Sequence, residues 1–293
     1  MRSFLFVPAD GGKKLDKAMA SGADAVIIDL EDSIAPDRKA AARRSAAAFL
    51  AEAAKSANRP QLLVRVNAIA TGLIDEDLDA IAGAKPDAIM LPKAEGGASI
   101  IHLDAKLTAC EAIAGLPDRS IRILAIATET AAALFLAGTY AGASNRLVGL
   151  TWGAEDLSAE LGAETNRDAD GCFLDPYRMA RALCLAGASA AQVPAFDTVT
   201  PEFRNTDLLR REAEEARRDG FQGKIAIHPV QVPIINEVFT PTVAAVGRAR
   251  AIVAAFEANP EKGAVAIEGV MYDRPHLARA SRLLAQAKSA GLG

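Results

Sequence analysis

Glu129 and Asp156 are acidic residues that follow two apolar segments of the chain, residues 122–127 and 146–150. Both segments have the length and the aliphatic composition of buried strands. Neighbouring strands of a sheet run about 5 Å apart, so carboxylates at their ends can reach the same ion. Because Mg²⁺ is typically held by one or two carboxylates and keeps positions for water and substrate oxygens, the pair predicts a Mg²⁺ site, with Mn²⁺ as an alternative ion.

Polar residues also follow the other segments that we interpret as strands. In a parallel barrel the carboxyl ends of all strands meet on one face, where active sites are placed. Helix capping and loop solvation are the alternative explanation, and we prefer it for Ser33 and Asp37. The remaining candidates are Asp29, Glu31, Asp32, Arg65, Asn67, Pro92, Lys93, Glu129, Trp152, Gly153, Glu155, Asp156, Asp197, His228 and Pro229.

Short aliphatic runs alternate with longer segments of helical period, which predicts a parallel sheet with crossover helices. We expect strands at residues 3–7, 25–29, 61–65, 88–91, 122–127, 146–150, 193–196 and 224–227. We expect helices at residues 14–21, 38–55, 103–114, 177–188 and 208–219. A (β/α)8 TIM barrel needs about 31 residues per unit, which matches this spacing. A doubly wound open sheet is the alternative.

The segment after the eighth expected strand is surplus to a barrel. It contains an expected helix at residues 242–257, a bend at 259–263, an apolar run at 264–272 and a last helix at 275–287. We therefore divide the chain into a barrel domain, residues 1–240, and a C-terminal helical extension or lid, residues 241–293.

Composition favours a soluble, cytoplasmic enzyme over a nucleic-acid or membrane protein. The formal net charge is −4, and hydrophobic residues make up 51% of the chain. Nucleic-acid and membrane-surface proteins are usually more basic. The apolar run at the N-terminus stops at Pro8, which is too short for a signal peptide or a membrane span. The 3 cysteines have no metal-type spacing, so we expect no disulfide.

Several other chemistries find little support. The 3 histidines lack the spacing of a zinc site. The G-x-S-x-G turn that carries a serine nucleophile does not occur, and neither do the nucleotide-binding motifs G-x-x-x-x-G-K-[ST] and G-x-G-x-x-G. Gly11-Gly12-Lys13-Lys14 could touch a phosphate, although two glycines before a helix are more often a flexible helix start. Lys93 could form a Schiff base, but a salt bridge to a nearby carboxylate is the preferred interpretation.

Taken in order, the strand ends resemble those of the citrate lyase β-subunit-like family, within the HpcH/HpaI-type aldolases. The matching blocks cover nearly the whole chain: residues 2–9 (RSFLFVPA), 28–32 (IDLED), 64–67 (VRVN), 91–93 (LPK), 129–130 (ET), 153–157 (GAEDL), 223–231 (GKIAIHPVQ) and 269–275 (GVMYDRP). Val270 and Tyr272 depart from the lysine or smaller residue expected at these positions in parts of the family.

The resemblance implies a Mg²⁺-dependent carbon–carbon lyase for acyl thioesters of malyl, citramalyl or citryl type, carried on coenzyme A or a carrier protein. It releases an acetyl thioester and a 2-oxo acid. Glu129 and Asp156 would bind Mg²⁺, and Arg65 would hold a substrate oxygen beside Gly153 and Ala154. Glu31 and Asp32 would support the site through water and Arg65. His228, Pro229 and Gln231 would shape the mouth where coenzyme A lies.

The resemblance also implies a homotrimer, or a dimer of trimers, in which the extension crosses to a neighbouring subunit. Asp273 would then complete the neighbour's site, with a pKa raised by desolvation toward the range useful for proton transfer. Its alternative role is a helix N-cap, because it stands two residues before Pro275. A malyl-coenzyme A thioesterase and a non-catalytic acyl-thioester-binding subunit are the alternatives to a lyase.

Overall fold

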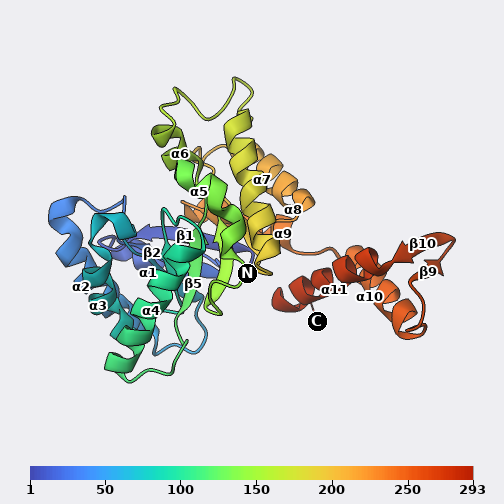
Figure 1. The fold of residues 1–293 in the computed structure, drawn as a ribbon, viewed down its shortest axis with the longest axis horizontal. Coiled ribbons are helices and arrows are strands. Elements are labelled where there is room, and N and C mark those ends of the chain that lie inside the picture. The colour runs from blue at the N-terminus through green and yellow to red at the C-terminus, as the bar shows by residue number, and fades with distance from the viewer. Residues whose placement is uncertain (293) are drawn as a thin grey trace.

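Eight parallel strands close into a barrel in the computed structural model, which describes residues 1–292 (Figure 1). Each strand pairs with the next in chain order, and β8 pairs with β1, so the sheet has no open edge. The strands are β1 (Ser3–Pro8), β2 (Ala25–Asp29), β3 (Gln61–Arg65), β4 (Ala88–Leu91), β5 (Arg122–Ile126), β6 (Leu147–Thr151), β7 (Ala195–Asp197) and β8 (Gly223–Ala226). The (β/α)8 prediction is confirmed, and the open sheet is excluded.

Helices surround the barrel, and the long ones lie where the sequence predicts them. They are α1 (Lys13–Met19), α2 (Lys39–Ala53), α3 (Ile74–Ile81), α4 (Gly97–Ala114), α5 (Ala131–Leu136), α6 (Ala154–Glu160), α7 (Asp175–Ala190), α8 (Thr206–Asp219) and α9 (Val232–Phe239). Short 3-10 turns occur at Pro36–Arg38, Ile69–Thr71, Ala82–Ala84, Ala137–Tyr140 and Pro229–Gln231. The helices α3, α5, α6 and α9 were not predicted, because 6 to 8 residues give only weak evidence of a helical period; α1, with 7 residues, was predicted.

Alternate residues of each strand point into the barrel, as the two-residue period of a strand requires. The inner layer is a separate apolar cluster that includes Ala25, Ile27 and Leu63. Asp29 and Arg65 continue the same inward-facing rows at the carboxyl ends of β2 and β3, where they are Cα partners. The barrel therefore brings these two side chains together at its mouth.

The sixth strand begins one residue later than predicted. The pairing of β5 with β6 shifts between Ile123 and Leu124, and Arg146 precedes the strand. Its guanidinium is fully buried, 2.7 Å from Glu111 and 2.5 Å from Asp104, both on α4. Arg146 thus packs against a helix outside the barrel and does not take part in the strand.

After α9 the chain forms an extension made of α10 (Val243–Glu257), a hairpin of β9 (Ala264–Ile267) and β10 (Val270–Asp273), and α11 (Arg274–Ser289). Both helices were predicted, whereas the apolar run at 264–272 was not recognised as a hairpin. Its turn residues Glu268 and Gly269 have φ of 49° and 80°, as a tight two-residue hairpin turn requires. The extension has its own small core, in which Ile252, Phe256 and Val265 are buried.

The extension projects from the barrel, and the hairpin lies at its far end (Figure 1). The C-terminal half of α11 is the part near the barrel, because Arg282 and Gln286 share a cavity with Met1 and Gln222. Met1 and Gln222 precede β1 and β8, so this contact is on the face opposite the carboxyl ends of the strands. The division of the chain at residue 240 stays a prediction.

Within residues 1–292, one stretch, Pro229–Glu257, is long and apolar enough by composition alone to cross a membrane. It is not one straight helix, because α9 ends at Phe239 and Pro241 stands before α10 begins at Val243. The two helices have 8 and 15 residues, and each is shorter than the roughly 20 that a membrane span needs. The predicted absence of a membrane partner is not tested further by the structure.

Candidate active site

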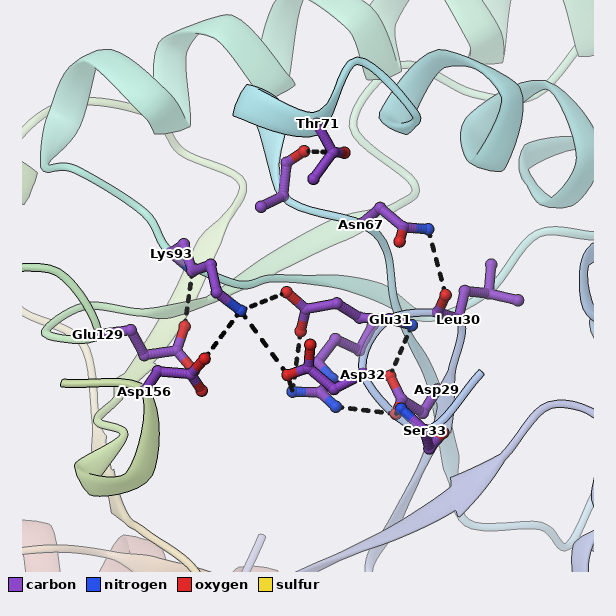
Figure 2. Close-up of polar contacts among 12 residues, drawn as sticks. Asp29, Leu30, Glu31, Asp32, Ser33, Asn67, Thr71, Lys93, Glu129 and Asp156 are labelled. Atoms are coloured by element: carbon purple, nitrogen blue, oxygen red, sulfur yellow. Dashed lines mark hydrogen bonds and ion pairs between the residues drawn. The ribbon is translucent and has the colours of Figure 1, made fainter. Parts of the chain in front are cut away.

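Glu129 and Asp156 lie side by side at the carboxyl ends of the strands (Figure 2). Glu129 follows β5, and Asp156 stands in the first turn of α6, directly after β6. Both line a cavity of about 360 Å³ at the mouth of the barrel, together with Arg65. The structure therefore brings together the three residues on which the predicted metal and substrate site depends.

The surroundings of Glu129 fit a cation. Its side chain is buried, and among the described residues one hydrogen bond reaches the carboxylate, from the Lys93 backbone N–H at 2.6 Å. Burial and the neighbouring Asp156 raise the pKa of Glu129 to about 8. A single hydrogen bond does not offset the loss of hydration of a buried, charged carboxylate. A bound metal ion would stabilise its charged form. Within residues 1–292 no third acidic, histidine or cysteine side chain completes the cluster, which leaves positions for water and substrate oxygens.

Gly153 leaves the space that Glu129 occupies. A Cβ atom at position 153 would lie 2.7 Å from Glu129 Cγ and 2.9 Å from its Oε1, closer than carbon atoms approach one another. The backbone of Gly153 is extended, with φ of −127°, so its conformation does not itself require glycine. Its absent side chain makes room for the predicted metal ligand, a function that the sequence analysis did not assign to it.

Gly153→Ala is expected to weaken Mg²⁺ binding by about tenfold or more, because the added methyl group would push the Glu129 side chain out of its position. Substitutions that displace a metal ligand in this way have effects of this size. Isothermal titration of the purified variant with Mg²⁺ measures the change. Gly247→Ala is the matched control, since a Cβ there has no neighbouring atom within 4 Å. Unchanged Mg²⁺ affinity in Gly153→Ala would show that Glu129 can bind the metal from another position.

Arg65 is held rigidly by acidic partners. Its Nε and one terminal nitrogen lie 2.7 and 2.8 Å from the two carboxylate oxygens of Asp29, and its other terminal nitrogen lies 2.9 Å from Glu31. Its guanidinium also stacks 4.7 Å from the centre of the Phe6 ring. Burial opposes the ionisation of Asp29, but the bonds from Arg65 outweigh it and lower the pKa of that carboxyl. Arg65 therefore reaches the cavity as a fixed cation.

Asp29 was a strand-end candidate to which no role was given. The signal that could have identified it is the alternation within the strands, since Asp29 and Arg65 both continue inward-facing rows. A bidentate arginine–carboxylate pair fixes the plane of the guanidinium as well as its position. We therefore interpret Asp29 as the residue that orients Arg65.

Glu31 and Asp32 contact Arg65 directly, which agrees with the expected support through Arg65, and they also contact Lys93; the part expected of water stays a prediction. Glu31 is buried and touches both cations, whereas the Asp32 side chain is exposed and lies 3.6 and 3.7 Å from them. Burial outweighs the two cations and raises the pKa of Glu31. Neither residue lines the cavity, so they hold the cations in place, and a part in catalysis itself stays a prediction.

Lys93 forms the salt bridge that the sequence analysis preferred to a Schiff base. Its Nζ lies 2.7 Å from Glu31 Oε1. Burial works against its charge, but the bond to Glu31 and the nearby carboxylates raise the pKa of Lys93 above its usual value. A charged ammonium has no electron pair for attack on a carbonyl, so these surroundings oppose Schiff-base chemistry.

The expected coenzyme-binding residues separate into two kinds. His228 and Pro229 are exposed, and the His228 ring stacks on Phe203 at 4.6 Å. Gln231 is fully buried: its side chain accepts bonds from the N–H groups of residues 227 and 228 and donates one to the Thr200 carbonyl. The Gln231 side chain therefore shapes the loop from inside and is not exposed to a ligand in the single chain, and the role of this loop in binding coenzyme A stays a prediction.

Gly12 and Ala154 stand at the starts of two helices that follow barrel strands. Gly12, with φ of 47°, stands at the start of α1, which agrees with a helix start, while the phosphate role stays a prediction. Ala154 begins α6 beside Gly153, and both residues line the cavity, as substrate-binding residues should.

Asp273 is the N-cap of α11 in the isolated chain, so its alternative role is confirmed there. Its carboxylate accepts a bond from the His276 N–H and contacts the His276 ring. This contact lowers the pKa of Asp273, and the raised pKa that we expected is absent from the single chain. Asp273 is the last residue of β10, a strand that lies away from the barrel in Figure 1. It cannot act on the cavity of its own chain in this arrangement.

Comparison with known proteins identifies the family of this chain. Residues 2–229 match the model of the HpcH/HpaI aldolase/citrate lyase family. A "citrate lyase subunit beta-like protein" of Mycobacterium tuberculosis is 37% identical over 287 residues, which are 98% of this chain and 96% of the relative. A "(3S)-malyl-CoA thioesterase" of Cereibacter sphaeroides is 36% identical over 295 residues, 98% of this chain and 95% of the relative.

Solved structures show the same architecture. The crystal structure of the M. tuberculosis protein CitE in complex with magnesium, acetoacetate and coenzyme A has a TM-score of 0.76 and 35% identity, and the match covers 98% of each chain. A second CitE structure, in complex with magnesium and pyruvate, has a TM-score of 0.71 and 32% identity over 97% of each chain. The family model matches residues 2–229, and the relatives match over nearly the full length of the chain. This chain belongs to the HpcH/HpaI aldolase/citrate lyase family.

Proposed function

We propose that this protein is a Mg²⁺-dependent carbon–carbon lyase that cleaves or forms a 3-hydroxyacyl thioester of malyl, citramalyl or citryl type. The observation that carries the proposal is the convergence of Glu129 and Asp156 on one cavity beside the fixed cation Arg65. The complex of the related CitE with magnesium, acetoacetate and coenzyme A supports the metal and the coenzyme A thioester.

The residues of the cavity suit the two charges that the reaction creates. Cleavage requires the substrate hydroxyl to lose its proton and the departing acetyl thioester to be stabilised as an enolate. Bound to Glu129 and Asp156, Mg²⁺ supplies a Lewis acid for the substrate's oxygens. Arg65 donates hydrogen bonds from a fixed fork, which Asp29 and Glu31 hold before the substrate arrives. Because this fork is held in advance, its reorganisation costs little during the reaction.

A thioesterase is the second candidate, favoured by the 36% identity to the (3S)-malyl-CoA thioesterase over 98% of this chain. It would use the same site to place a water against the thioester carbonyl. A non-catalytic thioester-binding subunit is a weaker candidate, because Arg65, Glu129 and Asp156 are all present and in contact with the cavity. Product analysis separates the three.

The purified protein is expected to condense acetyl-coenzyme A with at least one of glyoxylate, pyruvate and oxaloacetate, and to cleave the product in reverse. Chelation should abolish this activity, and added Mg²⁺ should restore it. Chromatography of the products distinguishes a lyase, which releases acetyl-coenzyme A, from a thioesterase, which releases free coenzyme A and the hydroxy acid. Full activity after exhaustive chelation would contradict the proposal.

The extension has the features of an arm that docks on another subunit, in a homotrimer or a dimer of trimers. Val270 and Met271, next to Asp273 on β10, are 54% and 64% exposed. Exposed apolar residues in a row mark surfaces that another chain covers. α11 is 16 residues long, so Asp273 stands about 24 Å from the end of the helix that lies near its own barrel. Docking on a neighbour would bring Asp273 to a strand-end cavity and desolvate it.

A further inference from the structure

Lys93 contacts both predicted metal ligands at once. Its backbone N–H donates to Glu129 Oε2 at 2.6 Å, and its Nζ lies 3.1 Å from Asp156 Oδ1. The same ammonium lies 2.7 Å from Glu31 Oε1 and 3.7 Å from Asp32 Oδ2. Figure 2 shows it between the Glu129–Asp156 pair on one side and the acidic residues after β2 on the other. A protein cation thus stands among the carboxylates that would receive the metal.

The backbone of Lys93 has an uncommon conformation, which lets its N–H reach Glu129 while its side chain reaches Asp156. Its φ is 49°, in the left-handed region that residues other than glycine seldom adopt. Such residues persist where the surrounding structure requires them, often at functional sites. Here the conformation directs the N–H to Glu129 while the side chain reaches Glu31 and Asp156. The position of the ammonium is therefore a built feature of the site.

The charges at the mouth explain what this ammonium does. Arg65 is occupied by Asp29 and Glu31, which leaves Lys93 as the cation nearest to Asp156 within the described residues. A divalent ion on Glu129 and Asp156 would lie beside the ammonium, and like charges at such a distance repel. Lys93 and the metal therefore compete for the same carboxylate.

We infer that the Lys93 ammonium is an internal cation that holds Asp156 in the metal-free enzyme, and that Mg²⁺ binds by displacing it from this carboxylate. Its bond to Glu31 remains, so the ammonium keeps a partner after the exchange. The site stays folded without metal, and its Mg²⁺ affinity is lower than two free carboxylates would give. This inference rests on the proposed function only through the identity of the two metal ligands.

The test is Mg²⁺ affinity, measured by isothermal titration at constant pH and ionic strength. Lys93→Met removes the ammonium and keeps the backbone N–H, so it is expected to bind Mg²⁺ about tenfold or more tightly than the wild type. Lys93→Arg keeps the charge and should bind with nearly wild-type affinity. Lys55→Gln, which removes an exposed lysine paired with Glu52 at 2.6 Å, is the matched control and should change nothing.

If Lys93 had a purely structural role, Lys93→Met would bind Mg²⁺ more weakly than the wild type, because the substitution would damage the site. Unchanged or weaker binding by a folded Lys93→Met protein would overturn the inference. If this variant does not fold without metal, recovery of its circular dichroism in Mg²⁺ is expected, and a chain that stays unfolded in Mg²⁺ would also overturn it. The rise in melting temperature caused by Mg²⁺ should exceed that of the wild type.

Glu129→Gln separates this inference from the proposed function. If the wild type does not bind Mg²⁺, or if Glu129→Gln binds it equally well, the proposed metal site is wrong. If Glu129→Gln abolishes binding while Lys93→Met fails to tighten it, the metal site stands and only the displacement of Lys93 is wrong.

Discussion

Glu129→Gln is expected to remove measurable Mg²⁺ binding and to lower lyase turnover by roughly three orders of magnitude. The amide keeps the size of the side chain but lacks the negative charge that a hard cation requires. Isothermal titration measures the first effect, and the release of acetyl-coenzyme A measures the second. Glu52→Gln, at an exposed position on α2, is the control and should retain wild-type values.

Proton release provides a second measurement at the same residue. Burial and the neighbouring Asp156 raise the pKa of metal-free Glu129 to about 8, and the ionised form is the one that binds metal. Below pH 8 each Mg²⁺ ion therefore displaces a proton, and the affinity should rise up to about tenfold per pH unit from pH 6 to pH 8 and then level off. An affinity independent of pH would show that Glu129 is already ionised in the free protein.

Asp273→Asn is expected to lower turnover at least about a hundredfold with little change in stability. Asparagine caps a helix as well as aspartate does, so α11 keeps its start while the proton-transferring carboxylate is lost. Steady-state kinetics and thermal unfolding measure the two effects. Asp207→Asn, in the first turn of α8, is the control for the loss of one acidic residue near a helix start. A near-wild-type rate for Asp273→Asn would leave Asp273 only its capping role.

Mixing subunits tests whether Asp273 acts on a neighbour. An inactive Arg65→Gln protein supplies an intact Asp273, and an Asp273→Asn protein supplies an intact Arg65. If each site combines the two residues from different chains, random reassembly of equal amounts should restore about a quarter of the sites. Activity that does not recover, in mixtures shown by light scattering and mass spectrometry to contain both chains, would contradict the exchange of the arm.

The barrel could be predicted because its evidence is local and repeated. Each strand is a short apolar run followed by a polar residue, and eight such runs at regular spacing allow few architectures. Four short helices were missed because 6 to 8 residues give only weak evidence of a helical period, and the β9–β10 hairpin was missed because the run at 264–272 was interpreted as one apolar segment. The start of β6 was misplaced by one residue, since Arg146 follows an apolar pattern but pairs with Glu111 and Asp104 instead.

The sequence could predict which residues belong to the candidate site, but not which of their side chains contact one another. Chain order placed Glu129, Asp156, Arg65, Glu31 and Lys93 at strand ends. Chain order alone did not show that Asp29 holds Arg65, because that pairing emerges only when the alternation within both strands is used to find the inward face. Nor could it show that Gln231 is buried, since burial depends on the loop that folds over it from residue 200.

The sequence by itself determined the architecture and the identity of the acidic pair, because strand length, strand spacing and residue type are properties of local segments. The tertiary structure decided what lies between those residues: the space at Gly153, the ammonium of Lys93 among the carboxylates, and the distance of Asp273 from its own barrel. The first two features arise from close approach between segments far apart in the chain, and the third arises from the extension projecting away from the barrel. Side-chain direction, burial and register fix such approaches only once the barrel has closed.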